Sequence, residues 1–194
     1  MTSVLVVGGG PAGLSAALFA AKNGLDVTVF GTDETWMHKA HLFNYPGIGS
    51  IGGTEFMGVT RQQADDFGAD RRQGEAVADV EDGGDGFAVT TDDGEYEASY
   101  LVLATGADRS LAEDLGCAMT DDGVVDVGVD METSVADAYA TGAMVRFEEW
   151  QAVIAAGDGA AAALNILSKE KGDHFHDFDV PADATEAFGT MADG

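Results

Sequence analysis

The first thirty residues contain two short apolar runs, at 4–7 and 27–30, that are rich in β-branched residues. Such runs are typical of buried strands. Residues 14–21 between them are rich in alanine and favour a helix, and the glycine-rich stretch 8–13 joins the first run to this helix. The pattern therefore predicts a strand, a glycine turn, a helix and a second strand, which is the repeating unit of a parallel sheet.

Three glycines in this turn have the spacing G-x-G-x-x-G. In that arrangement Gly8 permits a tight turn, Gly10 lets the backbone approach a pyrophosphate, and Gly13 lets the helix pack close to the strands. The amino terminus of the helix supplies unpaired N–H groups and the positive end of a dipole, which favour an anion beside Pro11 and Ala12. We expect a dinucleotide here; the alternative is a glycine turn that binds no nucleotide.

A second candidate contact follows the second apolar run. Asp33 lies about twenty positions beyond the glycines, the spacing at which an acidic residue commonly binds the hydroxyls of an adenosine ribose. Gly31, two residues earlier, allows the ribose a close approach. We expect Asp33 to bind the ribose, although in so acidic a chain a solvated aspartate is nearly as good an explanation.

Residues 35–53 form a long segment that is too aromatic for an ordinary solvated loop, and long loops of this kind are often functional. Its aromatic and histidine side chains are Trp36, His38, His41, Phe43 and Tyr45. They predict either a cover for a bound cofactor or a filling for the core under the loop. The two histidines have no further ligands near them in sequence, so we expect no metal site.

The rest of the chain alternates between helical and strand patterns. Residues 54–68 predict an amphipathic helix, residues 100–104 a buried parallel strand, and residues 150–167 a helix of small residues. Between the amphipathic helix and the buried strand, apolar and polar residues alternate with a period of two. This alternation predicts short antiparallel strands at 76–80, 87–91 and 95–99. We expect an α/β fold with a parallel sheet, a crossover helix and an antiparallel β-meander.

Charge and composition narrow the possible partners and compartment. The formal net charge is −26, from 35 acidic and 9 basic residues, so nucleic acid and anionic membranes are unlikely partners. Because 45% of the residues are hydrophobic and fall in regular runs, the acidity indicates a high-salt cytoplasm rather than disorder. No apolar run is long enough to span a membrane, and the first residues form a core strand rather than a signal peptide. We expect a cytoplasmic protein.

At this point a resemblance becomes specific. The glycine turn, the Asn44-Tyr45-Pro46-Gly47 turn, the β-meander and the strand end at 104–107 together resemble the FAD domain of the thioredoxin reductase family. The resemblance implies a Rossmann-like FAD-binding domain over residues 1–171, followed by an acidic tail at 172–194. His174 and His176 in that tail are expected to be solvated rather than to bind a metal.

The resemblance also has a gap. The family inserts a NAD(P)H-binding domain with a redox-active cysteine pair after the strand end, but here the chain passes, near 110–115, into a segment that resembles the family's return to its FAD domain. Cys117 is the one cysteine and is expected to be a buried apolar residue. We therefore expect FAD to exchange electrons with a partner protein or a diffusible donor, without dithiol chemistry. No catalytic residue is evident.

The family pattern extends the candidate FAD site to the end of the chain. It places Gln151 and Ala152 at the flavin, where the amino terminus of the 150–167 helix favours negative charge on the pyrimidine edge. Where the family has an aspartate that binds the ribityl chain, this chain has Ala143, and one lost hydrogen bond costs roughly 0.5–1.5 kcal/mol, or about tenfold in affinity. The full candidate set is Gly8, Gly10, Pro11, Ala12, Gly13, Gly31, Asp33, Asn44, Val77, Thr105, Gly106, Gly142, Ala143, Gln151 and Ala152.

Three further expectations concern the assembly, the activity and the ligand of the protein. The resemblance implies a homodimer, in which the aromatic segment or a separate redox protein shields the flavin. A non-catalytic flavin-binding sensor or assembly module is an alternative to an oxidoreductase. A nicotinamide or another adenine nucleotide in the same site is a third possibility.

Overall fold

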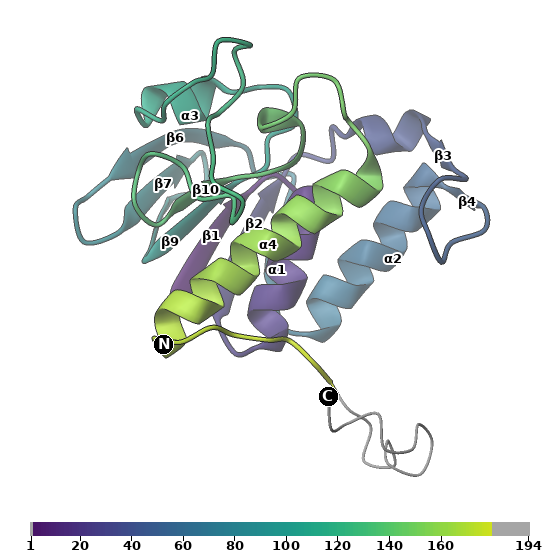
Figure 1. Ribbon diagram of the computed structural model, residues 1–194, viewed down its shortest axis with the longest axis horizontal. Helices are drawn as coiled ribbons and strands as arrows, with labels where there is room; N and C mark the ends of the chain where they lie inside the picture. Colours follow the sequence, from purple (N-terminus) through teal and green to yellow (C-terminus); the bar gives the residue numbers. More distant parts are fainter. Residues whose placement is uncertain (1, 180–194) are drawn as a thin grey trace.

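A parallel sheet of five strands, in the order β10-β9-β1-β2-β5, runs through the computed structural model, which describes residues 2–179. Its strands are β1 (Ser3–Val7), β2 (Asp26–Gly31), β5 (Asp70–Gln73), β9 (Tyr100–Leu103) and β10 (Ala138–Ala140). Helices α1 (Pro11–Lys22), α2 (Gly53–Asp66) and α4 (Ala152–Lys171) cover one face (Figure 1). The antiparallel strands β6 (Val77–Asp82), β7 (Phe87–Thr91) and β8 (Glu95–Ala98) cover the other.

Shorter elements connect these layers. A 3-10 turn, η1 (Trp36–Lys39), and the small antiparallel pair β3 (His41–Leu42) and β4 (Ile51–Gly52) lie between β2 and α2. A one-turn helix, α3 (Ser110–Asp114), follows β9, and a second 3-10 turn, η2 (Gly142–Met144), follows β10. The connections after β2, β9 and β10 thus all leave the same edge of the sheet, because the strands are parallel.

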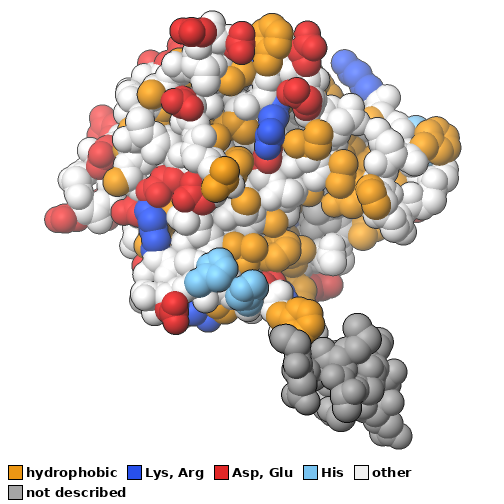
Figure 2. All heavy atoms as spheres, viewed as in Figure 1, with side chains coloured by type: hydrophobic (Ala, Val, Ile, Leu, Met, Phe, Trp, Pro, Cys, Tyr) orange, Lys and Arg blue, Asp and Glu red, His pale blue; other side chains and the backbone are white. Residues whose placement is uncertain are grey.

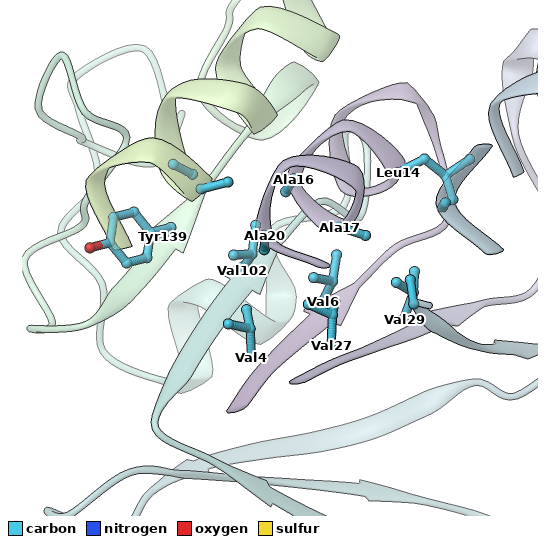
Figure 3. Close-up of a cluster of buried hydrophobic side chains, with 14 of the residues drawn as sticks. Val4, Val6, Leu14, Ala16, Ala17, Ala20, Val27, Val29, Val102 and Tyr139 are labelled. Atoms are coloured by element: carbon cyan, nitrogen blue, oxygen red, sulfur yellow. The ribbon is translucent and has the colours of Figure 1, made fainter. Parts of the chain in front are cut away.

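The last four residues of β1 and all of β9 are buried on both faces, which explains why these stretches are apolar. Val4 and Val6 of β1 face the helices, whereas Leu5 and Val7 face the β-meander. Figure 3 shows the valines of β1 and β2 lying against the apolar face of α1. The core therefore consists of two apolar layers, one on each face of the sheet.

Helices α1 and α4 pack very closely. A Cβ atom added to Gly159 of α4 would lie 2.0 Å from the carbonyl oxygen of Ala12, so only glycine fits there. The small residues of both helices allow this approach, and Figure 1 shows the two helices side by side on the sheet. The first and last helices of the described chain are thereby joined into one layer.

The expected fold is confirmed: a parallel sheet, a crossover helix and an antiparallel meander are all present. The helix expected at 150–167 begins at Ala152 and continues to Lys171, because the left-handed Gly172 (φ 67°) caps it only there. Cys117 is buried, as expected. Among residues 2–179, no helix has the length and apolar character needed to cross a membrane.

The start of the acidic tail differs from the expectation of a solvated segment. Asp177 folds back onto α1, where its carboxylate lies 2.7 Å from Nζ of Lys22 and its side chain is only 8% exposed. His174 and His176 are exposed, with their rings 4.7 Å apart between centroids. The prediction of solvation is therefore right for the histidines and wrong for Asp177, because a lysine on α1 pairs with it. Residues 180–194 of the tail lie outside the described residues.

Candidate functional site

A cleft of about 680 Å³ opens at the edge of the sheet where β1, β2, β9 and β10 end. This is the edge at which α/β proteins of this topology bind ligands, and the volume is within the range of small-molecule sites. Its lining includes the glycine turn after β1, two residues of β6 (Val77 and Ala78) and the residues around the start of α4.

The glycine turn has three glycines with three different roles. Gly8 has φ 120°, and a Cβ there would lie 2.1 Å from the carbonyl oxygen of Ala104. A Cβ on Gly13 would lie 1.9 Å from the carbonyl oxygen of Gly8, so this glycine lets α1 pack on the turn. Gly10 has nothing within 4 Å of its Cβ position and lines the open cleft. The turn therefore leaves a backbone cradle in front of the amino terminus of α1.

Asp33 lines the cleft beyond this cradle and is held in a left-handed conformation with φ 67°. Its Oδ1 is 2.8 Å from Nε2 of His38 and also accepts a hydrogen bond from Arg61 of α2. The Arg61 hydrogen bond, and after it that of His38, lowers the pKa of Asp33 from its ordinary value of 3.8. Both bonds use Oδ1, so this ionised carboxylate can still accept hydroxyl groups through Oδ2.

The opposite end of the cleft joins two segments that are far apart in sequence. Asn44 donates a hydrogen bond of 2.7 Å from Nδ2 to Oε1 of Gln151. The rings of Trp36 and Trp150, which both line the cleft, lie 5.2 Å apart between centroids. The segment after β2 and the segment before α4 thus meet at the same end of the cleft.

The aromatic segment satisfies each of its two expected roles in part. Tyr45 packs on Phe56 and the main core, with the ring centroids 5.5 Å apart, so this residue fills the space under the loop. Trp36 is 61% exposed and Phe43 73% exposed, and they fill no core. Of the two, Trp36 also lines the cleft, so it stands where a cover for a bound cofactor would be.

The cleft is acidic. Its lining includes no Lys, Arg or His among the described residues, although acidic side chains are frequent there. These acidic residues are Asp33, Glu34, Glu75, Asp108, Asp114 and Glu149. The same imbalance is visible on the surface in Figure 2, where red carboxylates greatly outnumber blue basic groups. An anionic ligand is therefore attracted by backbone N–H groups and repelled by the carboxylate side chains.

The structure brings most of the candidate residues together. All of them line the cleft except Gly13, which packs behind the turn, and Asn44, which reaches the site through Gln151. Four residues of the site were not expected from the sequence: Arg61, Trp150, Arg109 and Arg146. Of these, Arg109 and Arg146 hold the segment before α4. Only tertiary packing reveals them, because none belongs to a local motif. In residues 2–179 no group of three or more His, Cys, Asp or Glu is placed to bind a metal.

Comparison with known proteins identifies the family. Residues 2–50 and 53–159 match the pyridine nucleotide-disulphide oxidoreductase family. The chain belongs to this family. Members are flavoproteins with oxidoreductase activity, and FAD is their typical cofactor.

Individual members of the pyridine nucleotide-disulphide oxidoreductases agree with this assignment. A thioredoxin reductase of Listeria monocytogenes is 34% identical over 109 residues, 55% of this chain and 34% of that protein. A dihydrolipoyl dehydrogenase of Haloferax volcanii is 29% identical over 175 residues, 86% of this chain and 34% of that protein. The chain therefore spans about a third of the length of these curated relatives.

A solved structure shows the same fold. The thioredoxin reductase from Gloeobacter violaceus superposes with a TM-score of 0.82 at 21% identity, covering 92% of this chain and 99% of that one. The residues around the cleft also suit FAD physically, because the open Gly10 position and the amino terminus of α1 form a cradle for a pyrophosphate. The fold and the cradle thus both fit the family's cofactor.

Proposed function

We propose that this chain is an FAD-dependent oxidoreductase domain resembling the FAD domain of thioredoxin reductase, with FAD bound non-covalently in the cleft. The supporting observation is that the glycine turn before α1 and the segment before α4 border the same cleft. These two segments are more than a hundred residues apart, and a long dinucleotide is the kind of ligand that spans them.

Within this proposal each part of the cleft has a task. The N–H groups around Gly10 and Pro11 hold the pyrophosphate, and the Oδ2 of Asp33 accepts a ribose hydroxyl. Gln151 and Ala152 lie at the amino terminus of α4, whose dipole favours negative charge on the pyrimidine edge of the ring system. Bound FAD supplies the electron-transfer chemistry.

We propose that the electrons come from a partner protein or a diffusible donor. Only residues 104–137 separate β9 from β10, where complete relatives of the family insert a nicotinamide-binding domain. Cys117 is the single cysteine, and burial raises the pKa of its thiol against a smaller opposing effect of Thr133, so it is a poor thiolate. Dithiol chemistry needs two cysteines, and this sequence has one.

The exposed aromatic residues support a second part of the proposal. Trp36, Phe43 and Trp150 expose large apolar side chains to solvent, and the two tryptophans also line the cleft. We propose a homodimer or a redox-protein complex that covers them. Light scattering of the purified protein, with and without FAD, measures whether a dimer forms; a strict monomer in both states removes the homodimer.

A flavin-binding sensor is the second candidate, and Ala143 is the observation that favours it. By itself, the missing ribityl anchor weakens FAD binding about tenfold and speeds its exchange, which suits a protein that reports cofactor availability. Rapid reduction of the bound flavin by a donor favours the oxidoreductase, whereas binding without turnover favours the sensor.

The decisive experiment uses the two tryptophans as reporters. Both tryptophans of the chain line the cleft, so FAD binding is expected to quench intrinsic fluorescence in a saturable titration. The titration is done in molar salt, with NAD⁺ and NADP⁺ as competing ligands. A protein that takes up no FAD, or that prefers a nicotinamide nucleotide, overturns the proposal.

Stopped-flow reduction of the loaded protein then tests the source of electrons. We expect NADH and NADPH to reduce the flavin slowly, because no motif orients them and the advantage of proximity is lost. Rapid, saturable reduction would contradict the partner-dependent part of the proposal and leave FAD binding intact.

A further inference from the structure

Arg109 makes an unusual set of contacts behind the wall of the cleft. Its Nε donates to the carbonyl oxygen of Met144 at 2.9 Å, and one NH2 group donates to the carbonyl oxygen of Ala143 at 2.9 Å. The same nitrogen reaches the carbonyl oxygen of Arg146 at 3.4 Å, and the other donates to that of Ala107 at 3.0 Å. The guanidinium thus joins the backbone that follows β9 to the backbone that follows β10.

This use of an arginine is different from that of the others. Arg61, Arg71, Arg72 and Arg146 each form an ion pair with an aspartate. In the part of the chain that the structure describes, Arg109 has no such partner and gives its donors to carbonyl groups. Its planar fork holds each donor in a fixed direction, whereas the donors of a lysine ammonium rotate freely.

A second arginine fixes the other end of the same segment. Arg146 forms a two-point ion pair with Asp158, with contacts of 2.6 and 3.2 Å, and Asp158 is buried in the second turn of α4. The carbonyl oxygen of Arg146 also accepts a hydrogen bond of 2.9 Å from Nε1 of Trp150. The segment 143–150 is therefore tied to α4 at one end and to the end of β9 at the other.

The segment that these arginines hold contains the departure from the family pattern. Ala143 lacks the carboxylate that anchors the ribityl chain in relatives, yet it lines the cleft beside Gly142. Because each peptide unit is planar, holding the carbonyl of Ala143 also fixes the direction of the next N–H group. The backbone at this end of the cleft is thereby oriented without any contact from a side chain at position 143.

We propose that Arg109 and Arg146 are positioning residues that orient residues 143–152 and the amino terminus of α4 toward the flavin, in place of the missing anchor at Ala143. This inference rests on the proposed function for its cofactor, but the ordering of the segment is a property of the protein alone. Neither arginine lines the cleft, so Arg109 acts through the backbone carbonyls that it binds and Arg146 through its ion pair with Asp158.

The test compares Arg109→Gln and Arg146→Gln with Arg72→Gln, which removes an exposed ion pair with Asp70 outside the cleft lining. The first measurement is amide hydrogen exchange without FAD. We expect exchange at 143–152 to be about tenfold faster in the first two variants and unchanged in the control. Unchanged exchange there, or equal acceleration along the whole chain, overturns the proposal.

The second measurement uses the FAD-loaded protein. We expect both variants to bind FAD about tenfold more weakly and to have a lower flavin midpoint potential, because a misaligned α4 favours negative charge on the ring less. Wild-type potential in both variants contradicts the proposal. If the wild-type protein binds no FAD, the proposed function fails, and the exchange experiment still decides whether the arginines order the segment.

A rescue experiment separates positioning from general damage. Ala143→Asp in the Arg109→Gln background restores the family's own ribityl anchor and is expected to recover most of the lost FAD affinity. Failure to recover, in a double variant that melts like the wild type, contradicts the idea that the arginines replace that anchor. If Arg109→Gln does not fold, Arg109→Lys keeps the charge with fewer aligned donors and is expected to show an intermediate loss.

Discussion

The two ends of the cleft are built in different ways. The end at α1 is made of backbone from one continuous stretch, with Gly8 and Gly13 fitted against neighbouring carbonyl groups. The end at α4 is made of side chains from several segments, through contacts such as Asn44 with Gln151 and Trp36 with Trp150. The first end therefore tolerates almost no change at its glycines, whereas the second can be altered piece by piece.

This difference assigns separate properties to the two ends. A backbone cradle offers N–H groups that every dinucleotide can use, so the α1 end provides affinity without much discrimination. The α4 end presents an amide, two indole rings and a helix terminus, which are groups that distinguish one ring system from another. We infer that the choice of ligand, and the tuning of its redox behaviour, belong to the α4 end.

The largest expected effect separates folding from binding within the α1 end. Gly13→Ala forces a Cβ to within 1.9 Å of the carbonyl oxygen of Gly8. Overpacking of this kind costs about 3 kcal/mol and outweighs the gain of about 1 kcal/mol in helix propensity. We expect the free energy of unfolding, measured by urea denaturation, to fall by about 2 kcal/mol or more.

Gly10→Val is the matched variant for the same turn. Its side chain meets no protein atom and enters the open cleft. We expect stability within about 1 kcal/mol of the wild type and FAD affinity lower by about a hundredfold, since the pyrophosphate loses its close approach. If Gly10→Val unfolds the protein while Gly13→Ala is tolerated, the division of roles within the turn is wrong.

A smaller effect is expected from the charge of the cleft. Six carboxylates line it and face a ligand that carries two phosphate charges. Salt shortens the Debye length from about 10 Å at 0.1 M to about 3 Å at 1 M, so FAD affinity is expected to rise with salt, by about tenfold over this range. Most anion sites show the opposite trend. Isothermal titration at several salt concentrations measures it.

Two charge variants locate the source of this salt effect. Glu34→Gln with Glu149→Gln removes two carboxylates from the lining and is expected to flatten the salt dependence. Glu95→Gln with Glu97→Gln removes two exposed charges on β8, outside the lining, and is expected to change the salt dependence little. Equal effects in the two proteins would mean that the overall charge of −26, rather than the cleft, repels the ligand.

The smallest effect concerns Asp33 and pH. Because Arg61 and His38 lower the pKa of this carboxyl in the folded protein, its contribution to stability is present above the unfolded pKa of 3.8. This contribution to stability is lost as the pH falls through the lower pKa that Asp33 has in the folded protein. In Arg61→Gln we expect the pKa of Asp33, measured by NMR, to rise toward 3.8 and this acid-side loss to shrink. An unchanged pKa would show that the ion pair does not form in solution.

Much of the fold follows from local sequence patterns. The unit β1-α1-β2 is fixed by two apolar runs around a glycine turn, and the meander by alternating residues between turns such as Gly83–Gly86, which a hydrogen bond closes. The residues around the glycine turn could be placed at the cleft for the same reason, since their geometry depends only on neighbours in sequence. Whether they bind FAD stays a prediction.

The side-chain contacts around the cleft could not be derived in this way. Nothing near Asp33 in the sequence points to Arg61, which reaches it from α2. The contact between Trp36 and Trp150 depends on how the chain returns to the sheet after β10. Arg109 carries no motif at all, because its partners are carbonyl groups that every residue possesses. Contacts of this kind depend on tertiary packing and have no local signature.

The close packing of α1 on α4 has a consequence for biosynthesis. During synthesis, α1 emerges from the ribosome long before α4. Until Gly159 packs against Ala12, one face of α1 has no partner helix. Contacts between such distant residues form late and make folding slow. The glycine turn can therefore form early in the nascent chain, but the cleft is complete only once α4 has docked.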